Sequence, residues 1–487
     1  MNKKEDAPKC CRQYLATHCH QIATNLLRIA AKMLIITKTV RHSFMKNLVI
    51  IFASLFLLCA STNAQTYNNY TKEYTLVSQT EAGIEADRTH RMVLCDYQPS
   101  GLYVKKGERI GFAVSGLDGK YKLSSMIGFK PMWGNRNKTQ ENALQNGANT
   151  VNATQDGILS FIFVRAEGYD TNPSSVNVKV TGGKAFPLYH LGKSNVANWE
   201  NDLKTMKDAN FVQLISDRAL LTITYKDYIK KPIRDLAASF QSIHSVIIWE
   251  DELAGFDNTT PQNRVTRNRI NYLIDLYSTP KEAEDYYMYA SNYFIGMKRD
   301  NYTDLTEKLK TEWGIWHETG HTHQQRSWTW DSIGEISVNL FSLYVQEKYG
   351  RPSTLAQVQG GETLTNFEKA RKYIADPNKN YLVSNEEADY NELFSKLVMF
   401  HQLKSVYGWD AIKKLHQYFR QKPYVEIDDE TDADMANKFI YAMCSITKNN
   451  LMPFFKKWGL STNAATTKKI NDLKLPLPKT DPSKIFS

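Results

Sequence analysis

Cysteine is scarce in this chain of 487 residues, and most of its six copies stand near the beginning. Four precede residue 65: Cys10, Cys11, Cys19 and Cys59. Only Cys95 and Cys444 follow, and they lie in different regions of the sequence. Two distant cysteines exclude a disulfide-stapled scaffold, so we expect each to be a small, buried apolar side chain.

An excess of one charge is also missing from most of the chain. The formal net charge is +10, but residues 1–64 contain nine Lys or Arg and two Asp or Glu, a net of +7. The remaining residues therefore carry only about +3. Domains that bind nucleic acid concentrate basic side chains, so we expect no nucleic-acid partner. Internal repeats and low-complexity segments are absent as well.

Long hydrophobic runs are absent with one exception, the eleven residues Leu48–Leu58. Met45 and a lysine precede this run, and the small residues of Thr62-Asn63-Ala64 follow it. The run is too short for a convincing membrane span and is typical of a secretory signal. We therefore predict a signal peptide over residues 45–64, cleaved after Ala64, with translation starting at Met45.

This prediction makes residues 1–44 a doubtful leader and places the protein outside the cytoplasm. We expect it to be secreted, at the cell surface or periplasmic, with no stable membrane span once the signal is removed. A lipid anchor on Cys59 is the alternative, although Leu58 is bulky for the position before a lipidated cysteine.

Residues 65–184 have the pattern of a small β-sandwich. Short runs alternate in hydrophobicity or are rich in β-branched residues, with Gly, Asp and Asn between them. The clearest runs are Gly101–Val104, Arg109–Val114, Leu159–Val164 and Ser175–Val180. The segment shows no obvious aromatic platform for sugars, so a bracing role is favoured over glycan binding.

From residue 185 the pattern becomes mixed α/β, and after about residue 358 it is mainly helical. Strands are expected at Phe211–Ile215, Ala219–Thr224 and Tyr286–Ala290, with a helix near 227–243. The helical part extends to about 458, and the Pro- and Lys-rich residues 476–487 are expected to form a tail.

The most informative motif is His317-Glu318-Thr319-Gly320-His321. On a helix this spacing places both imidazoles on one face, where they can bind one zinc ion. Glu318 points into the same site and can deprotonate a water there. Glu335 can supply a third ligand, because Ser332-Ile333-Gly334 can turn the chain into a second helix. The alternative is a chance pair of surface histidines.

The residues around the motif predict two helices. Asp304 and Glu307 resemble a capping box, and an apolar stripe continues from Leu305 to Trp316. A second helix is expected from Glu335 to Tyr349, ended by Gly350. Asn339 lies one turn beyond Glu335 and could accept the free ring N–H of a ligand histidine; an ordinary polar helix residue is the alternative. Gly320 either permits close approach of another backbone or is a tolerated accident.

These segments resemble the enhancin-like family of zinc metallopeptidases, gluzincins that include mucin-degrading bacterial proteases. The resemblance rests on Trp313–Gln324, Trp328 and Gly334–Tyr344, and it extends over roughly residues 185–460. Further similar segments are Phe186–Lys193, Met288–Asn292, Tyr407–Asp410 and Pro453–Gly459. The resemblance implies that His317, His321 and Glu335 bind zinc, that Glu318 is catalytic, and that the substrates are O-glycosylated proteins such as mucins.

Together, the sequence predicts an α+β protein. A β-sandwich over residues 65–184 precedes a gluzincin-type metallopeptidase domain over residues 185–475, with an α/β lobe to about 358 and a helical lobe after it. The predicted activity is zinc-dependent hydrolysis of peptide bonds in O-glycosylated proteins. Trp328 and Trp330 could stack on sugar rings, or equally could be core or loop anchors. Tyr390 or His401 could stabilise the oxyanion, but a core role is favoured for both.

Two other functions are open at this point. One is a non-catalytic glycan-binding or adhesion protein on a peptidase fold, against which the intact Glu318 argues. The other is a zinc aminopeptidase of the same clan, but no G-x-M-E-N-type amine-binding signature precedes the metal motif.

Overall fold

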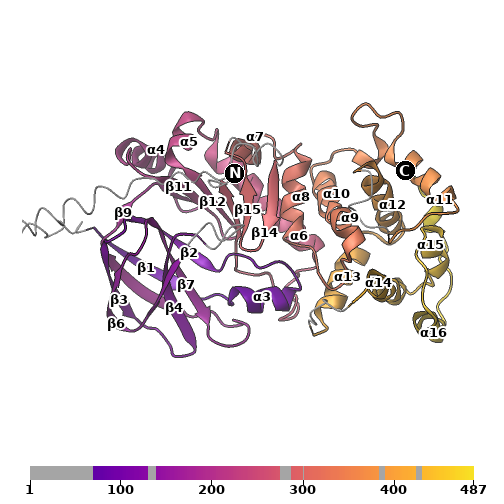
Figure 1. Ribbon diagram of the computed structural model, residues 1–487, viewed down its shortest axis with the longest axis horizontal. Helices are drawn as coiled ribbons and strands as arrows, with labels where there is room; N and C mark the ends of the chain where they lie inside the picture. Colours follow the sequence, from indigo (N-terminus) through magenta and orange to yellow (C-terminus); the bar gives the residue numbers. More distant parts are fainter. Residues whose placement is uncertain (1–69, 130–138, 275–286, 300, 383–389, 424–429) are drawn as a thin grey trace, which may run out of the picture. The chain divides into compact units, whose positions relative to one another are not determined.

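The computed structural model describes residues 70–129, 139–274, 287–299, 301–382, 390–423 and 430–487. The leader of residues 1–44 and the predicted signal peptide of residues 45–64, with Cys59, lie outside these ranges. Residues 68–487 form one compact unit. Strands dominate its first part and helices its last part (Figure 1). The architecture is therefore α+β, with antiparallel sheets near the N-terminus and a helical C-terminal region, as the sequence predicts.

The first part of this unit contains two antiparallel sheets that share one core. The strand orders are β1-β8-β3-β6 and β5-β4-β7-β2-β9. The strands are β1 (Thr71–Val77), β2 (Tyr97–Val104), β3 (Arg109–Ser115), β4 (Tyr121–Ile127), β5 (Gln140–Leu144), β6 (Gly147–Asn152), β7 (Gly157–Arg165), β8 (Ser175–Thr181) and β9 (Lys184–Ala185). In β8, buried valines alternate with exposed residues, the pattern of a strand with one face in a core. Phe112 and Phe161 pack together between the sheets. One helix, α3 (Ala82–Thr89), interrupts the strands.

A six-stranded mixed sheet follows, in the order β10-β11-β12-β13-β15-β14. Its strands are β10 (Leu188–His190), β11 (Phe211–Ile215), β12 (Ala219–Thr224), β13 (Ile270–Ile274), β14 (Met288–Ser291) and β15 (Phe294–Met297). Its helices are α4 (Val196–Thr205), α5 (Tyr225–Lys230) and α6 (Leu236–Leu253). β14 is an edge strand and pairs only with β15, antiparallel. The predicted strands at 211–215 and 219–224 are confirmed, and β14 covers residues 288–290 of the third, while Tyr287 lies just before it.

The helix that carries the motif is shorter than the apolar stripe predicts. α7 (Asp304–Glu307) ends before residue 308, and α8 (Trp313–His321) begins only after Glu312, which has an extended backbone. Between them, the Leu309 carbonyl accepts the indole N–H of Trp316 at 2.7 Å. In a continuous helix this carbonyl would bond to the backbone N–H of Trp313. The stripe is nevertheless buried, with Leu305, Leu309 and Trp316 at most 1% exposed.

The predicted second helix is also divided. A short 3₁₀ turn, η5 (Asp331–Ile333), leads into α9 (Gly334–Ser337), and α10 (Asn339–Lys348) continues after Val338. Gly350 adopts a positive φ of 66° and ends α10, as predicted. At Gly320, an added Cβ would lie 3.0 Å from the Cβ of Phe341 in α10. Gly320 therefore permits the close approach of α8 and α10.

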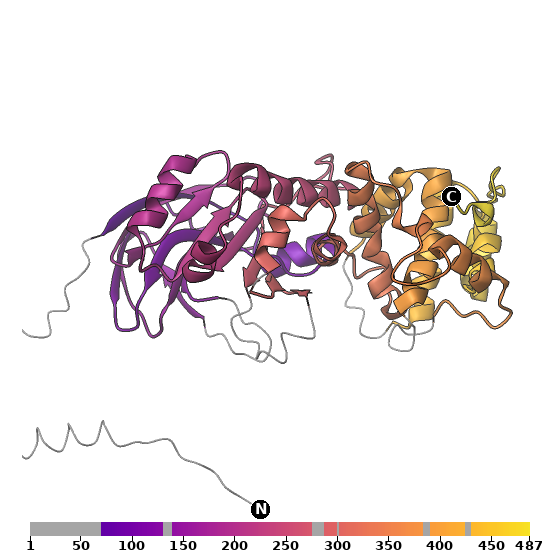
Figure 2. The same cartoon turned by 90° about the horizontal axis from the view of Figure 1, so that it is seen from above.

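The C-terminal region is a group of helices around one large core. They are α11 (Asn366–Ala375), α12 (Tyr390–Tyr407), α13 (Trp409–Arg420), α14 (Asp432–Thr447), α15 (Met452–Lys457) and α16 (Ala464–Asp472). Short 3₁₀ turns lie elsewhere along the chain: η4 (Asn301–Thr303), η6 (Thr354–Ala356) and η7 (Pro482–Lys484). Figures 1 and 2 both show these helices on one side of α8 and the strands on the other. Residues 476–487, expected to form a tail, are packed only near their end: Leu477 is exposed, but Pro482 and Ser483 are buried, and Gln402 donates to the Ile485 carbonyl at 2.9 Å.

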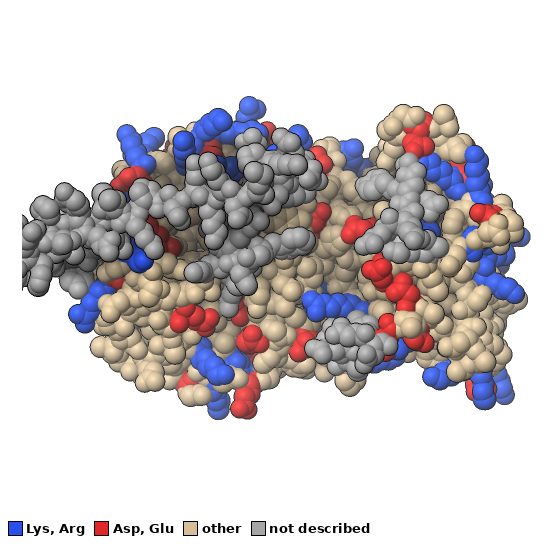
Figure 3. Space-filling view, in the orientation of Figure 1, with Lys and Arg blue, Asp and Glu red and all other residues tan. Residues whose placement is uncertain are grey.

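Other sequence predictions concern cysteines, charge and membrane spans. Cys95 and Cys444 are free thiols and fully buried, as expected. Basic and acidic side chains are interspersed over the face shown in Figure 3. Among the described helices, none combines the length and the apolar character needed to cross a bilayer.

Candidate metal centre

Three side chains of α8 and α9 converge on one point. His317 and His321 share one face of α8, and Glu335 in α9 faces both. The two Nε2 atoms are 3.0 Å apart, and the carboxylate oxygens of Glu335 lie 3.0 Å from Nε2 of His317 and 3.5 Å from Nε2 of His321. Bonds of about 2.0–2.1 Å to a tetrahedral zinc would place ligand atoms about 3.3 Å apart. The three predicted ligands therefore fit one such ion.

A side-chain amide contacts Nδ1 of each histidine, on the side of the ring opposite the metal centre, and orients that ring. Asn339 Oδ1 lies 2.9 Å from Nδ1 of His317, and Gln324 Oε1 lies 2.6 Å from Nδ1 of His321. Other bonds fix the orientation of both amides. Asn339 Oδ1 accepts the indole N–H of Trp313 at 2.8 Å, and its Nδ2 donates to the Glu335 carbonyl. Both amides therefore present an oxygen to an imidazole Nδ1.

The tautomer of each neutral histidine follows from these contacts. Gln324 Nε2 donates to the Gly334 carbonyl at 2.6 Å and to Ser337 Oγ at 2.8 Å, so its oxygen must face His321. Nδ1 of His317 and of His321 must then carry the proton, and Nε2 of each presents a lone pair. Two lone pairs and a carboxylate at these distances repel each other unless a cation or a proton lies between them. This donor set of two imidazoles and one carboxylate is the chemistry of a catalytic zinc site.

The electrostatics of the three groups agree with this description. Burial disfavours the charged form of Glu335, but the two facing histidines outweigh burial and hold the pKa of that carboxyl well below its usual range. Burial also lowers the pKa of His321, yet the contact with Glu335 more than compensates and raises it. The Glu335 side chain is 47% exposed, which leaves one side of the centre open to solvent or substrate.

Glu318 lies beside this cluster on the same helix and does not belong to it. Burial raises the pKa of the Glu318 carboxyl, although His321 and His317 oppose the shift. A backbone hydrogen bond from Ala290 in β14 also reaches this carboxylate. Because the Ala290 N–H points at Glu318, the edge of β14 that pairs with no described strand faces the metal centre.

The structure corrects the possible sugar-binding role of Trp328 and Trp330. Both side chains are only 1% exposed and belong to the core of the helical region. Trp328 stacks on Phe439 with ring centroids 5.9 Å apart, and its indole N–H donates to Gln325. Neither ring is accessible to a sugar. Of the two oxyanion candidates, His401 bonds through Nε2 to the Ser487 carbonyl, and the side chain of Tyr390 lies outside the described part.

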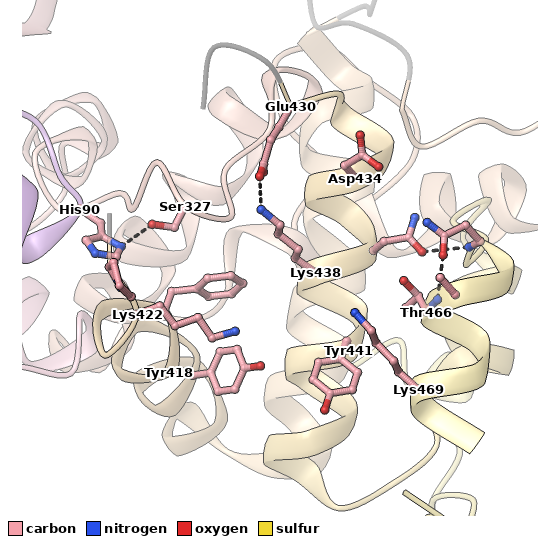
Figure 4. Close-up of a pocket in the computed structure, with 15 residues that line it drawn as sticks. His90, Ser327, Tyr418, Lys422, Glu430, Asp434, Lys438, Tyr441, Thr466 and Lys469 are labelled. Carbon is pink, nitrogen blue, oxygen red and sulfur yellow. Dashed lines mark hydrogen bonds and ion pairs between the residues drawn. The ribbon is translucent and has the colours of Figure 1, made fainter. Parts of the chain in front are cut away.

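A pocket of about 830 Å³ lies away from the metal centre, between the segment around Ser327 and helices α13, α14 and α16 (Figure 4). Tyr418 and Tyr441 contribute aromatic rings, and Glu430 pairs with Lys438 at its rim. None of the residues that line it belongs to the metal centre or is Glu318.

Of the two residues that hold the histidines, Asn339 is predicted from the sequence and Gln324 is not. Gln324 stands three residues after His321, just beyond the end of α8. Residues three apart on a helix share a face, and an amide there could have been identified as a second histidine partner.

Comparisons with known proteins decide the family. A sequence model described as Peptidase M60, enhancin and enhancin-like, matches residues 182–459, more than half of the chain. The chain belongs to this peptidase family. The M60 assignment implies a metal, which the geometry of His317, His321 and Glu335 fits.

Solved structures share the fold of this M60 chain. A functionally unknown conserved protein from Bacillus anthracis str. Ames is 29% identical with a TM-score of 0.73, over 85% of this chain and 81% of that one. The M60 catalytic domain of Clostridium perfringens ZmpC, in complex with the sialyl T antigen, is 17% identical with a TM-score of 0.66, over 85% and 82% of the chains. A metallopeptidase in complex with Tn antigen is 19% identical with a TM-score of 0.69, over 85% and 79%.

Curated relatives are much longer than this chain. A TRPM8 channel-associated factor homolog from Xenopus laevis is 25% identical over 68% of this chain, but over only 34% of its own length. Accessory colonization factor AcfD from Vibrio cholerae serotype O1 is 22% identical over 65% of this chain and 23% of its own length. The chain thus spans about a third or less of these relatives.

Proposed function

We propose that this protein is an exported zinc endopeptidase that hydrolyses peptide bonds in O-glycosylated, mucin-like proteins. The observation that carries the proposal is the convergence of two imidazole Nε2 atoms and one carboxylate, with both Nδ1 atoms fixed as donors. A structural zinc site would be closed by four protein ligands, whereas the part of the chain that the structure describes supplies three ligands and leaves an exposed side.

His317, His321 and Glu335 would hold the zinc, and Glu318 would act on the water. A bound zinc supplies a Lewis acid that polarises the scissile carbonyl and lowers the pKa of a water. Glu318 takes the proton of that water as it attacks the carbonyl and returns the proton to the leaving amine.

The edge of β14 supports a polypeptide substrate. A peptide can add to an exposed sheet edge through main-chain hydrogen bonds, and this edge lies beside Glu318. An extended peptide bound there would place one of its carbonyls near the metal centre. An aminopeptidase would also need a group that captures the free amine, and the sequence before the metal motif contains no such signature.

The glycan part of the proposal rests on the family and on its structural neighbours. Two proteins of the same fold are known in complex with O-glycan antigens, the sialyl T antigen and the Tn antigen. A site that hydrogen-bonds sugar hydroxyls leaves its own polar groups unpaired when the sugar is missing, so discrimination can be large. The rival proposal, a non-catalytic binding protein on a peptidase fold, does not require Glu318, which is intact here.

One experiment tests both substrate and mechanism. The purified protein is incubated with a peptide that carries the Tn antigen on one threonine and with the same peptide without sugar, and fragments are identified by mass spectrometry. We expect cleavage beside the glycosylated residue, with a chelator-sensitive rate at least about 100-fold higher than for the bare peptide. In a Glu318→Ala variant the rate should fall by about two to four orders of magnitude with zinc still bound.

The outcomes separate the parts of the proposal. Equal cleavage of both peptides would make the protein a general protease and reject the glycan requirement. Near-normal turnover by Glu318→Ala would reject the assigned mechanism, and binding of the glycopeptide without any cleavage would favour the non-catalytic alternative.

Export is proposed from the sequence of residues 45–64, with support from distant relatives. One relative is a colonization factor and another a putative lipoprotein. N-terminal sequencing of protein purified from its native host should give Gln65 as the first residue. An N-terminus at Met1 would contradict both the signal peptide and the start at Met45, and a lipid-modified Cys59 would identify an anchored form.

A further inference from the structure

Two buried arginines, Arg91 and Arg420, lie over the ring of Phe256, and the buried His416 stands four residues before Arg420 on the same helix. Arg91 follows α3, while His416 and Arg420 belong to α13. Their exposed fractions are 1%, 0% and 2%. The guanidinium carbons of Arg91 and Arg420 lie 4.5 Å and 4.0 Å from the centroid of the Phe256 ring. Segments far apart in the sequence therefore bring like charges onto one aromatic ring.

The buried carboxylates in this region are engaged by other groups. Glu85 pairs with Arg88, and both oxygens of Asp251 accept from Arg218 at 2.9 Å and 3.0 Å. The nearest oxygen of Asp251 is 3.7 Å from Nη1 of Arg91, too long for a hydrogen bond. Glu250 faces Nδ1 of His323 at 3.1 Å. Arg420 therefore has no ion-paired carboxylate among the described residues, and Arg91 has only the 3.7 Å ion pair with Asp251, a carboxylate that Arg218 also holds.

Several donors of the group have no acceptor. Within the described ranges, Nε, Nη1 and Nη2 of Arg91, Nη1 of Arg420 and both ring nitrogens of His416 make no hydrogen bond. The other nitrogens of Arg420 are satisfied by Asn263 and by the carbonyls of Ala254 and Gly255. A buried guanidinium with its donors unpaired is costly, because the water it has lost is not replaced.

The group also keeps its positive charge at neutral pH. Burial lowers the pKa of Arg91 to about 10, and burial together with the charge of Arg91 lowers that of Arg420 to about 9. Burial and the same two arginines hold the pKa of His416 well below its usual range. Two guanidinium charges therefore remain, beside a neutral imidazole that can donate one hydrogen bond.

We propose that Arg91, Arg420 and His416 enclose a binding site for one small monovalent anion, chloride in the natural setting. The site offers donors and no free acceptor, which favours a ligand that only accepts hydrogen bonds. Burial of the three side chains favours an ion of halide size over a larger oxyanion. A surface pocket of about 430 Å³, lined by Arg88, Arg420 and Lys422 among others, reaches Arg420 and gives the anion a route of entry.

The anion would stabilise the fold, because it binds only when α13 and the segments around Arg91 and Phe256 are in place. Melting of the zinc-saturated full chain is followed while sodium bromide replaces sodium gluconate at constant ionic strength. We expect the melting temperature to rise by a few degrees and to saturate with bromide. In crystals soaked in bromide, an anomalous peak should lie between Arg91 and Arg420.

Matched variants assign the effect to this site. Arg91→Met should abolish the bromide-dependent rise. Arg371→Met is the control, because exposed Arg371 also lies 4.5 Å over an aromatic ring, that of Phe486, and should leave the rise unchanged. His416→Phe keeps an aromatic ring but loses the hydrogen-bond donor, and it should raise the half-saturating bromide concentration at least tenfold. This second variant tests the site even if Arg91→Met does not fold.

Two results would overturn the proposal. One is a wild-type melting curve that is the same in bromide and in gluconate. The other is crystals whose density in the group is water alone, with no anomalous peak. Neither readout depends on peptidase activity, so the proposed function and the anion site can fail independently.

Discussion

At the scale of single residues, two amides determine what the histidines can do. Asn339 and Gln324 each turn an oxygen toward the Nδ1 atom of a histidine. The Trp313 indole N–H, which can only donate, fixes the Asn339 oxygen, and the Gly334 carbonyl, which can only accept, fixes the Gln324 nitrogen. The lone pairs of His317 and His321 are therefore directed into the metal centre before any metal binds. Such preorganisation reduces the cost of assembling the site.

Replacing either amide should weaken zinc binding. In Asn339→Leu or Gln324→Leu, one histidine loses the acceptor that fixes its tautomer and ring orientation. We expect the zinc affinity to fall by about 10–100-fold in each variant, as is typical when the partner of a ligand histidine is removed. Competition with a chromogenic chelator measures this affinity.

Gln346→Met is the control for this measurement. Gln346 is also an amide of α10, but it bonds to Thr354 and not to a ligand histidine. Its replacement should leave the zinc affinity within about twofold of wild type. If all three variants lost affinity equally, general destabilisation of the protein would explain the effect, and the role assigned to Asn339 and Gln324 would be wrong.

At the scale of elements, the metal centre depends on how closely α8 approaches α9 and α10. The two contacts closest to an added Cβ at Gly320 involve Phe341 and Val338, at 3.0 Å and 3.2 Å. A glycine in a helix costs about 1 kcal/mol relative to alanine. Here that cost allows the helices to approach closely enough for Glu335 to reach both histidines.

Gly320→Ala should therefore destabilise the protein although alanine favours helices. Crowding against α10 should cost about 1–3 kcal/mol, which outweighs the gain of about 1 kcal/mol in helix propensity. Gly334→Ala is the matched comparison, because a Cβ there meets nothing within 4 Å, and it should be neutral or stabilising. Denaturant unfolding of both variants checks the signs, and a stabilised Gly320→Ala would contradict the packing argument.

At the scale of the whole molecule, a metal would connect α8 with α9, and through them the sheet region with the C-terminal helices. α8 packs its Trp316 into the core of the six-stranded sheet, whereas Ile336 of α9 belongs to the core of the helical region. An ion held by residues of both helices links the two cores. Zinc should therefore stabilise the whole compact unit and not only the site.

Metal analysis and melting together test this link. The wild-type protein should contain close to one zinc per chain, and chelation should lower its melting temperature by several degrees, since ligand at 100 times its Kd contributes about 2.7 kcal/mol. His321→Ala should contain much less zinc and should melt at the same temperature with or without chelator. Equal zinc content in both proteins would remove His321 from the ligand set.

The sequence by itself determined the local features of this protein. The spacing of four residues between His317 and His321 places two imidazoles on one helical face. Alternation in segments such as 175–180 sets the two faces of a strand. Both features depend only on the periodicity of the backbone. The sequence also pointed to Asn339, which lies one helical turn from Glu335.

Only the tertiary structure decided features that depend on distant neighbours. Trp328 and Trp330 are buried because Phe439, about a hundred residues later, packs against both. Arg91 and Arg420 meet over Phe256 only when the segments that follow α3 and α6 have docked on α13. Burial and unpaired charge arise from packing between elements, and local sequence patterns do not encode which elements will meet.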